Sequence, residues 1–163
     1  MRILILLIIL MSSIGCDEEE GGMIVDYDFE DTEYSIIVES IEDLNTVAEK
    51  ELVYIQTRGN AKKLWKNSLD SVIARFDECG DSKFGETVSG DIAICVTNIK
   101  EYAKEPSSPL SYDKYLMAVF KHELGHLIGL DHSDDPNDIM HPYSLISYNY
   151  SQNDIQKILE ASK

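Results

Sequence analysis

The chain has 163 residues, of which 44% are apolar, enough for one compact domain and too few for two ordinary ones. Asp and Glu total 30 against 14 Lys and Arg, which gives a net charge of −16. A protein this acidic repels phosphate backbones, so we expect no nucleic-acid partner. Its four His and three Cys restrict any site built from imidazole or thiolate to a short list of residues.

The first 15 residues are typical of an export signal. Arg2 precedes the apolar run Ile3 to Met11, and small residues then lead to Gly15 and Cys16. The run is too short to span a bilayer comfortably, since a spanning helix needs roughly 20 apolar residues. Gly15-Cys16 resembles the lipobox of bacterial lipoproteins, in which the signal is cut before a Cys that is then acylated. The alternative is an ordinary cleaved signal with an incidental Cys16, which would make the protein secreted.

Residues 16–33 are expected to form the lipid anchor and an acidic tether. From Asp17 to Glu33 there are nine acids and no base, with Gly21-Gly22 in the middle. Such a segment repels itself and stays extended, which suits a spacer between a membrane and a domain. Calcium binding is another interpretation of these carboxylates, but their spacing matches no calcium loop. The sequence therefore predicts one folded domain over residues 34–163.

The first half of this domain is expected to contain two strands and a long helix. Tyr34 to Glu39 and Leu52 to Thr57 are β-branched and aromatic runs of strand length, with room for a short helix over 40–50. Asn60 can cap a helix whose apolar residues recur at helical spacing, and Gly80 stands just past its end. Those apolar residues are Leu64, Trp65, Leu69, Val72, Ile73 and Phe76. Such a helix would lie on a sheet.

Another strand and two helices are expected in the second half. Ile92 to Val96 follows a turn and reads as a strand, and Ser111 can cap the next helix. The apolar residues of that helix are Tyr115, Leu116, Val119, Phe120, Leu124 and Leu127. The second of these helices is expected near the end of the chain, where Ser151 and Asp154 have capping-box spacing.

Cys79 and Cys95 would remain in the exported protein, in a compartment where disulfides persist. A bridge between them would close a loop of about 16 residues and contribute roughly 3 kcal/mol. Strand alternation, however, places Cys95 on the face opposite Ile92 and Ile94. A helix that ended at Cys79 and covered the isoleucine face would prevent the bridge. The sequence leaves a disulfide and two free thiols both open.

The segment HELGH at residues 122–126 fits H-E-x-x-H, which on a helix places two imidazoles one turn apart on one face. Gly129 can end the helix and fold the chain back, so that His132 becomes a third ligand. Three protein ligands leave the fourth position of tetrahedral zinc open for water, as in catalytic zinc sites. We therefore expect one catalytic zinc ion, held by His122, His126 and His132.

These residues resemble a known family. HELGHLIGLDH, residues 122–132, resembles the extended zinc motif of the metzincin metallopeptidases, and Ser133 directly after it resembles their matrixin branch. IMHPY, residues 139–143, is similar to the matrixin Met-turn, with Met140 under the zinc ligands. SQNDIQKI, residues 151–158, resembles the C-terminal helix of that family.

The resemblance implies an α+β fold, a minimal metzincin-like catalytic domain with a small mixed twisted sheet. A long backing helix, an active-site helix and a C-terminal helix would accompany the sheet. It also implies a zinc metalloendopeptidase, in which Glu123 is the general base that activates a zinc-bound water. Pro142 and Tyr143 are expected to line the substrate cleft, and His141 to be an exposed loop residue.

The expected protein is thus an extracytoplasmic, lipid-anchored zinc endopeptidase, a monomer that acts on peptides or proteins. An extended substrate would pair with a sheet edge, for which Ile92 to Thr97 is the candidate because it is the strand nearest in sequence to the active helix. The alternative is a non-catalytic zinc-binding or adhesion lipoprotein that keeps the fold. Glu123 favours the enzyme, since a protein that only bound metal would gain nothing from that carboxylate.

Overall fold

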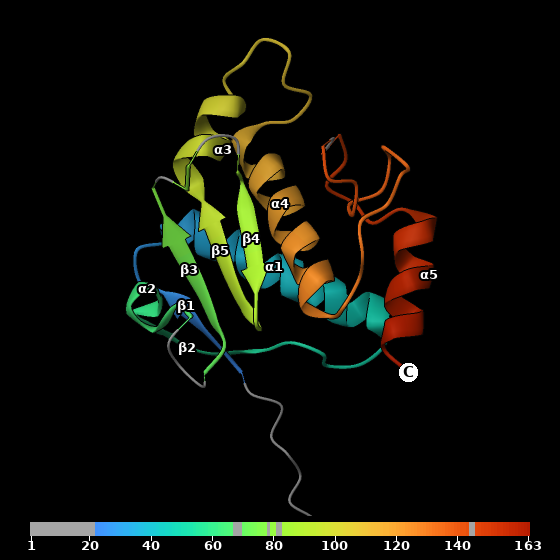
Figure 1. The fold of residues 1–163 in the computed structure, drawn as a ribbon, viewed down its shortest axis with the longest axis horizontal. Helices are drawn as coiled ribbons and strands as arrows, with labels where there is room; N and C mark the ends of the chain where they lie inside the picture. Colours follow the sequence, from blue (N-terminus) through green and yellow to red (C-terminus); the bar gives the residue numbers. More distant parts are fainter. Residues whose placement is uncertain (1–21, 67–69, 78, 81–82, 144–145) are drawn as a thin grey trace, which may run out of the picture.

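The computed structural model describes residues 22–66, 70–77, 79–80, 83–143 and 146–163. A five-stranded sheet packs against helices (Figure 1). The strands are β1 (Met23–Asp26), β2 (Ile55–Gly59), β3 (Val72–Phe76), β4 (Gly85–Val88) and β5 (Asp91–Cys95). The helices are α1 (Asp31–Ala48), α2 (Ala61–Leu64), α3 (Val96–Tyr102), α4 (Tyr112–Leu127) and α5 (Gln152–Ala161). The predicted signal peptide and the anchor at Cys16 lie outside the described residues.

The sheet has the order β2-β1-β3-β5-β4. All neighbouring strands are parallel except β4, which runs antiparallel to β5. The prediction that Ile92 to Thr97 forms the sheet edge is wrong, because β5 pairs with β3 on one side and β4 on the other. The edge strand on this side of the sheet is β4, next to β5. The predicted α+β architecture with a small mixed sheet is confirmed.

The long backing helix exists, but it is α1 and not the segment that the sequence predicted. Tyr34 to Glu39, expected as a strand, lies inside α1. Glu30 and Glu33 form a capping box at its start, which satisfies two backbone donors reciprocally. Its buried apolar residues recur at helical spacing: Ile36, Ile37, Ile41, Leu44 and Ala48. This periodicity over 18 residues outweighs the β-propensity of a short Ile-Ile-Val run.

The expectation of an extended tether as far as Glu33 is wrong for residues 22–33. Met23–Asp26 forms β1, which lies between β2 and β3 in the sheet. Phe29 is buried, and the acids nearby have partners within the domain. Asp26 accepts from the amide of Lys62, whose ammonium group pairs with Asp28 at 2.7 Å. The folded domain therefore includes these acidic residues.

The prediction of a long helix that begins after Asn60 is wrong beyond the first turn. Asn60 does cap α2, since its side chain accepts from the amide of Lys63, but α2 ends at Leu64. Val72 and Phe76, expected on the same helix, belong to β3. The strand predicted over Leu52 to Thr57 is present further along the chain, as β2.

Apolar residues on the two faces of the sheet pack against different helices. Val25, Ile73, Ile92 and Ile94 belong to the main core, together with buried residues of α1 and α4. A smaller cluster of Ala61, Val72 and Ala74 includes the start of α2. Helix α4 packs against α1 and also against β4, which places it beside the edge strand (Figure 1). No helix among the described residues is long and apolar enough to cross a membrane.

Cys79 and Cys95 form a disulfide, with Cα atoms 5.7 Å apart. The helix that would have prevented the bridge is not formed, because Val72–Phe76, which it would have included, is strand β3. Strands β3 and β5 are neighbours, and Phe76 lies opposite Cys95 in their register. Of the two alternatives that the sequence left open, the structure therefore has the disulfide.

Candidate metal centre

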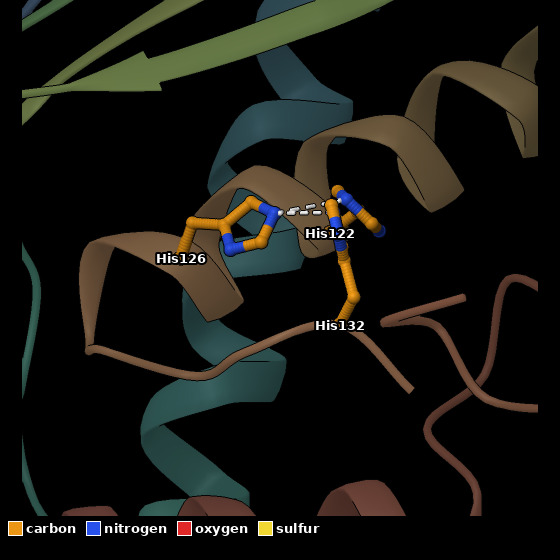
Figure 2. A group of neighbouring side chains, drawn as sticks. All are labelled: His122, His126 and His132. Carbon is orange, nitrogen blue, oxygen red and sulfur yellow. Dashed lines mark hydrogen bonds between the residues drawn. The ribbon is translucent and has the colours of Figure 1, made fainter. Parts of the chain in front are cut away.

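Helix α4 carries two of the three histidines, and a turn at a glycine after the helix brings the third histidine back to them. His122 and His126 lie one turn apart, with ring centroids 4.7 Å from each other. Gly129 follows the helix end with a φ of 86°, a conformation that favours glycine, and the Leu130 amide donates back to a carbonyl of α4. The chain reverses there and brings His132 to the other two rings, as Figure 2 shows.

The three imidazoles converge through their Nε2 atoms. Nε2 of His126 lies 3.1 Å from Nε2 of His122 and 3.1 Å from Nε2 of His132. These separations are close to that of two nitrogens sharing one tetrahedral zinc ion, about 3.3 Å. All three candidate ligand atoms lie within 4.8 Å of one another. The geometry therefore fits one zinc ion.

Backbone carbonyls orient the two imidazoles of α4. Nδ1 of His122 is 2.7 Å from the carbonyl oxygen of Ile139, and Nδ1 of His126 is 2.9 Å from that of Leu130. A carbonyl only accepts, so each Nδ1 carries the proton and each Nε2 presents a lone pair. Two lone pairs at 3.1 Å cannot hydrogen-bond to each other, and a cation bound between them removes this conflict. The donor set thus fits a bound metal ion by its own chemistry.

The protonation state of these rings also suits a metal. Burial lowers the pKa of His122 to about 4. Burial also lowers the pKa of His132, and the neighbouring His126 acts in the same direction. Metal ligation needs neutral imidazole, so near neutral pH these two rings do not have to lose a proton first.

Glu123 lies on α4 between the first two ligands in sequence, and its carboxylate contacts the edge strand. The residue is 6% exposed. Thr87 on β4 donates its hydroxyl to Oε2 of Glu123 at 2.7 Å. Burial raises the pKa of Glu123, whereas the hydrogen bond from Thr87 lowers it. A buried carboxylate with a raised pKa next to a metal site has the properties of a general base.

Met140 packs against the helix that carries the ligands. It is buried, and a Cβ added at Gly125 would overlap its sulfur atom, so the glycine of HELGH allows the close approach. The carbonyl of Met140 accepts from the amide of Ser133, directly after the third histidine. This loop therefore joins the end of the zinc motif to the Met-turn.

The comparisons with known proteins agree with this geometry. The family model described as Matrixin matches residues 56–161, a range that contains all three histidines and α5. The chain belongs to the matrixin family. It is a zinc-dependent peptidase with a metzincin-like fold, and one catalytic zinc ion is its cofactor.

Two solved structures are similar to this matrixin. One is archaemetzincin from Methanopyrus kandleri, at 19% sequence identity and a TM-score of 0.59 over 90% of this chain and 98% of the other. The second is a zinc-dependent peptidase from Methanocorpusculum labreanum, at 15% identity and a TM-score of 0.49 over 84% and 100% of the two chains. The first supports the fold. No curated protein sequence matches this matrixin.

A pocket of about 450 Å³ opens in front of the three histidines of this matrixin. Strand β4 lines one wall, and the loop that carries Pro142 and Tyr143 lines another. Tyr143 is 93% exposed at its rim, and His141, expected as an exposed loop residue, also lines the pocket. The structure thus brings both predicted cleft residues to the same pocket as Glu123.

Sequence reasoning missed the residues that β4 contributes to the site. Gly85 and Thr87 contact Glu123 from a strand that the sequence analysis did not identify. The short segment Gly85–Val88 has no alternation strong enough to mark a strand, and nothing in it resembles a motif. The carbonyl acceptors of Ile139 and Leu130 were missed as well, because backbone groups have no sequence signature.

Proposed function

We propose that this matrixin is an exported endopeptidase that cleaves peptide bonds within extended segments of protein substrates. The observation that carries the proposal is a single pocket that contains the histidine cluster, the buried carboxylate of Glu123 and the free edge of a strand. A protein that only bound zinc would need neither the buried carboxylate nor the free strand edge.

In this proposal His122, His126 and His132 hold the zinc ion through their Nε2 atoms. Zinc, when bound, supplies a Lewis acid that makes water a usable nucleophile near neutral pH and polarises the substrate carbonyl. Met140, packed against α4, supports the helix that presents two of the ligands. The site therefore needs no Ser or Cys nucleophile.

Glu123 acts as the general base and then as the general acid. Its carboxylate takes a proton from the water as the water oxygen bonds to the peptide carbonyl carbon. The same proton then passes to the leaving nitrogen as the C–N bond breaks. Burial favours this role, because it raises the pKa of Glu123 above its ordinary value and brings it nearer the working pH.

Strand β4 is the proposed docking edge for substrate, in place of β5. One side of β4 pairs with β5, and its other side ends the sheet, so its backbone groups can pair with an extended peptide. Pro142 and Tyr143 would contact the peptide from the opposite wall. An open strand edge accommodates a chain that continues in both directions, which favours endopeptidase over exopeptidase action.

Export and membrane attachment are part of the proposal on sequence grounds. A base at Arg2, the apolar run Ile3 to Met11 and the small residues before Cys16 support a lipoprotein signal. Acylation of Cys16 would then attach the folded domain to the outer side of a membrane.

The test uses purified full-length protein in detergent, with a mixture of unfolded proteins as substrate. We expect cleavage that a chelator abolishes, that added zinc restores, and that Glu123→Ala removes while bound zinc stays at one per chain. Undiminished proteolysis by Glu123→Ala would contradict the assignment of the base. One zinc per chain with no cleavage of any substrate would instead favour the non-catalytic zinc-binding lipoprotein.

A further inference from the structure

The hydroxyl of Thr87 lies between the edge strand and the active-site helix. Its Oγ1 is 2.7 Å from Oε2 of Glu123 and 3.0 Å from the backbone oxygen of the same residue. Thr87 pairs with Ile92 in the β4–β5 ladder, so its place on the strand is fixed by backbone hydrogen bonds. The contact joins two residues that are 36 positions apart in the chain.

We propose that Thr87 is a positioning residue that holds the carboxylate of Glu123 for proton transfer. The proposal rests on the function proposed above, in which Glu123 is the general base. Within the part of the chain that the structure describes, only Thr87 donates a hydrogen bond to the carboxylate of Glu123. Because the residue is 6% exposed, solvent offers few alternative donors to keep that carboxylate in one orientation.

Gly85 confines the other oxygen of the same carboxylate. It is two residues before Thr87 on β4 and therefore lies on the same face of the strand. A Cβ added at Gly85 would lie 2.6 Å from Oε1 of Glu123, so any larger residue would displace the carboxylate. Oε1 thus lies against Gly85, and Oε2 accepts a hydrogen bond from Thr87. Together these contacts fix the orientation of the carboxylate plane.

This arrangement assigns different tasks to the two oxygens. Oε2 already accepts the hydrogen bond of the Thr87 hydroxyl, which leaves Oε1 to take the proton of the water. In that step the water O–H bond breaks, an Oε1–H bond forms, and the water oxygen bonds to the carbonyl carbon. Oε2 remains an acceptor after the transfer, so the Thr87 hydrogen bond persists until the proton moves on to the leaving nitrogen. The carboxylate therefore need not reorient between its two tasks.

The experiment compares Thr87→Val, which keeps the shape and removes the hydroxyl, with Thr87→Ser, which keeps the hydroxyl. Thr57→Val is the matched control, because it removes a hydroxyl that donates to a backbone carbonyl on the opposite edge strand, β2. We expect Thr87→Val to lower kcat by about 10- to 100-fold, the loss typical of a hydrogen bond to a charged group, with KM within about twofold. Thr87→Ser should recover most of kcat, and Thr57→Val should match the wild type.

Two measurements do not depend on turnover. Bound zinc should stay at one per chain in both Thr87 variants, since the histidines are untouched. Crystal structures of the metal-free variants should show the Glu123 carboxylate in its wild-type place in Thr87→Ser and rotated or disordered in Thr87→Val. Thr87→Ala replaces Thr87→Val if the latter does not fold, with the same expected results.

An unchanged kcat in Thr87→Val would overturn the proposal. So would a raised KM at constant kcat, which would mean that Thr87 shapes only the docking edge, or a failure of Thr87→Ser to recover activity. Glu123→Gln separates this proposal from the one it rests on. If Glu123→Gln retains activity, the proposed function fails; if it is inactive while Thr87→Val is normal, the inference on Thr87 alone fails.

Discussion

Asp154 accepts a hydrogen bond from the backbone amide of Ile139 through Oδ2, at 2.9 Å. The carbonyl of the same Ile139 accepts from Nδ1 of His122 at 2.7 Å. Asp154 belongs to α5 and Ile139 to the loop before Met140, so a carboxylate at the start of the C-terminal helix anchors the residue whose carbonyl orients a zinc ligand. Asp154 also accepts from the amide of Ser151 as part of the capping box.

The first prediction concerns this link. Asp154→Ala should weaken zinc binding by about 10- to 100-fold, because the loop that orients His122 loses its anchor. Competition with a chromophoric chelator measures the zinc Kd. Glu160→Ala is the control, since it removes a carboxylate from the exposed side of the same helix. An unchanged zinc Kd in Asp154→Ala would show that Ile139 holds its place without Asp154.

The histidine cluster was predictable from sequence because its geometry is local. His122, His126 and His132 lie within a single helix and the turn that follows it, and a 3.6-residue period plus a glycine suffices to bring them together. The contact between Thr87 and Glu123 depends instead on the packing of β4 against α4. No local pattern encodes that packing, so the contact of Thr87 with Glu123 was found only in the structure.

The fold class was predictable, but the placement of the elements in the first half was not. Short runs such as Tyr34 to Glu39 have β-branched residues that suit a strand, while the helical period becomes visible only over the whole of α1. Val72 and Ile73 matched a helical pattern by spacing, yet β3 uses them on opposite faces of the sheet. Periodicity over a short window cannot distinguish a strand from a part of a helix.

A second prediction concerns the disulfide. Cys79→Ser combined with Cys95→Ser should lower the free energy of unfolding by about 3 kcal/mol, since the bridge closes a loop of 16 residues and restricts the unfolded chain. Urea unfolding measures the change. Reductant should lower the stability of the wild type to that of the double variant and leave the variant unaffected. Equal stability of both proteins without reductant would contradict the prediction.

A third prediction concerns the proposed lipid anchor at Cys16. Cys16→Ser should release the protein from membranes, because the acyl chains would have no attachment site. Cells grown with a palmitate analogue should label the wild type, and Cys16→Ser should be unlabelled. Cys79→Ser serves as the control for thiol labelling elsewhere, and it should keep the acyl label. A wild-type protein that is unlabelled and found in the medium would show that the export signal is an ordinary one.

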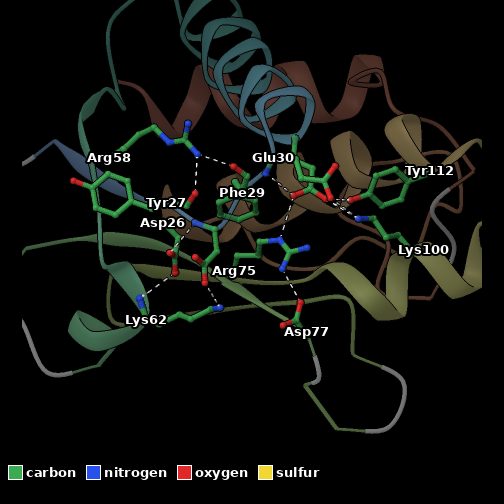
Figure 3. Close-up of polar contacts among 12 residues, drawn as sticks. Asp26, Tyr27, Phe29, Glu30, Arg58, Lys62, Arg75, Asp77, Lys100 and Tyr112 are labelled. Carbon is green, nitrogen blue, oxygen red and sulfur yellow. Dashed lines mark hydrogen bonds and ion pairs between the residues drawn. The ribbon is translucent and has the colours of Figure 1, made fainter.

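The last prediction concerns Glu33, a buried carboxylate at the start of α1. Tyr112 donates to it at 2.6 Å, Arg75 pairs with it at 3.2 Å and Lys100 at 3.1 Å, so it connects α1 to β3, α3 and the start of α4. Figure 3 shows these three partners converging beside the labelled Glu30. Burial raises the pKa of Glu33, but these hydrogen bonds and charges together hold it below its ordinary value of 4.5.

A carboxyl group whose pKa is lower in the folded state stabilises the protein above its unfolded pKa, near 4.5, and this contribution is lost as the pH falls through the folded value. Glu33→Gln should therefore lower the free energy of unfolding at pH 7 by about 2–3 kcal/mol. The difference from wild type should shrink steadily below pH 4.5, as the wild-type carboxyl group becomes protonated. Urea unfolding from pH 7 to pH 3 measures it, with Glu39→Gln on the exposed side of α1 as the control. A difference that stays constant with pH would show that the cost comes from the shape of the amide and not from the lost charge.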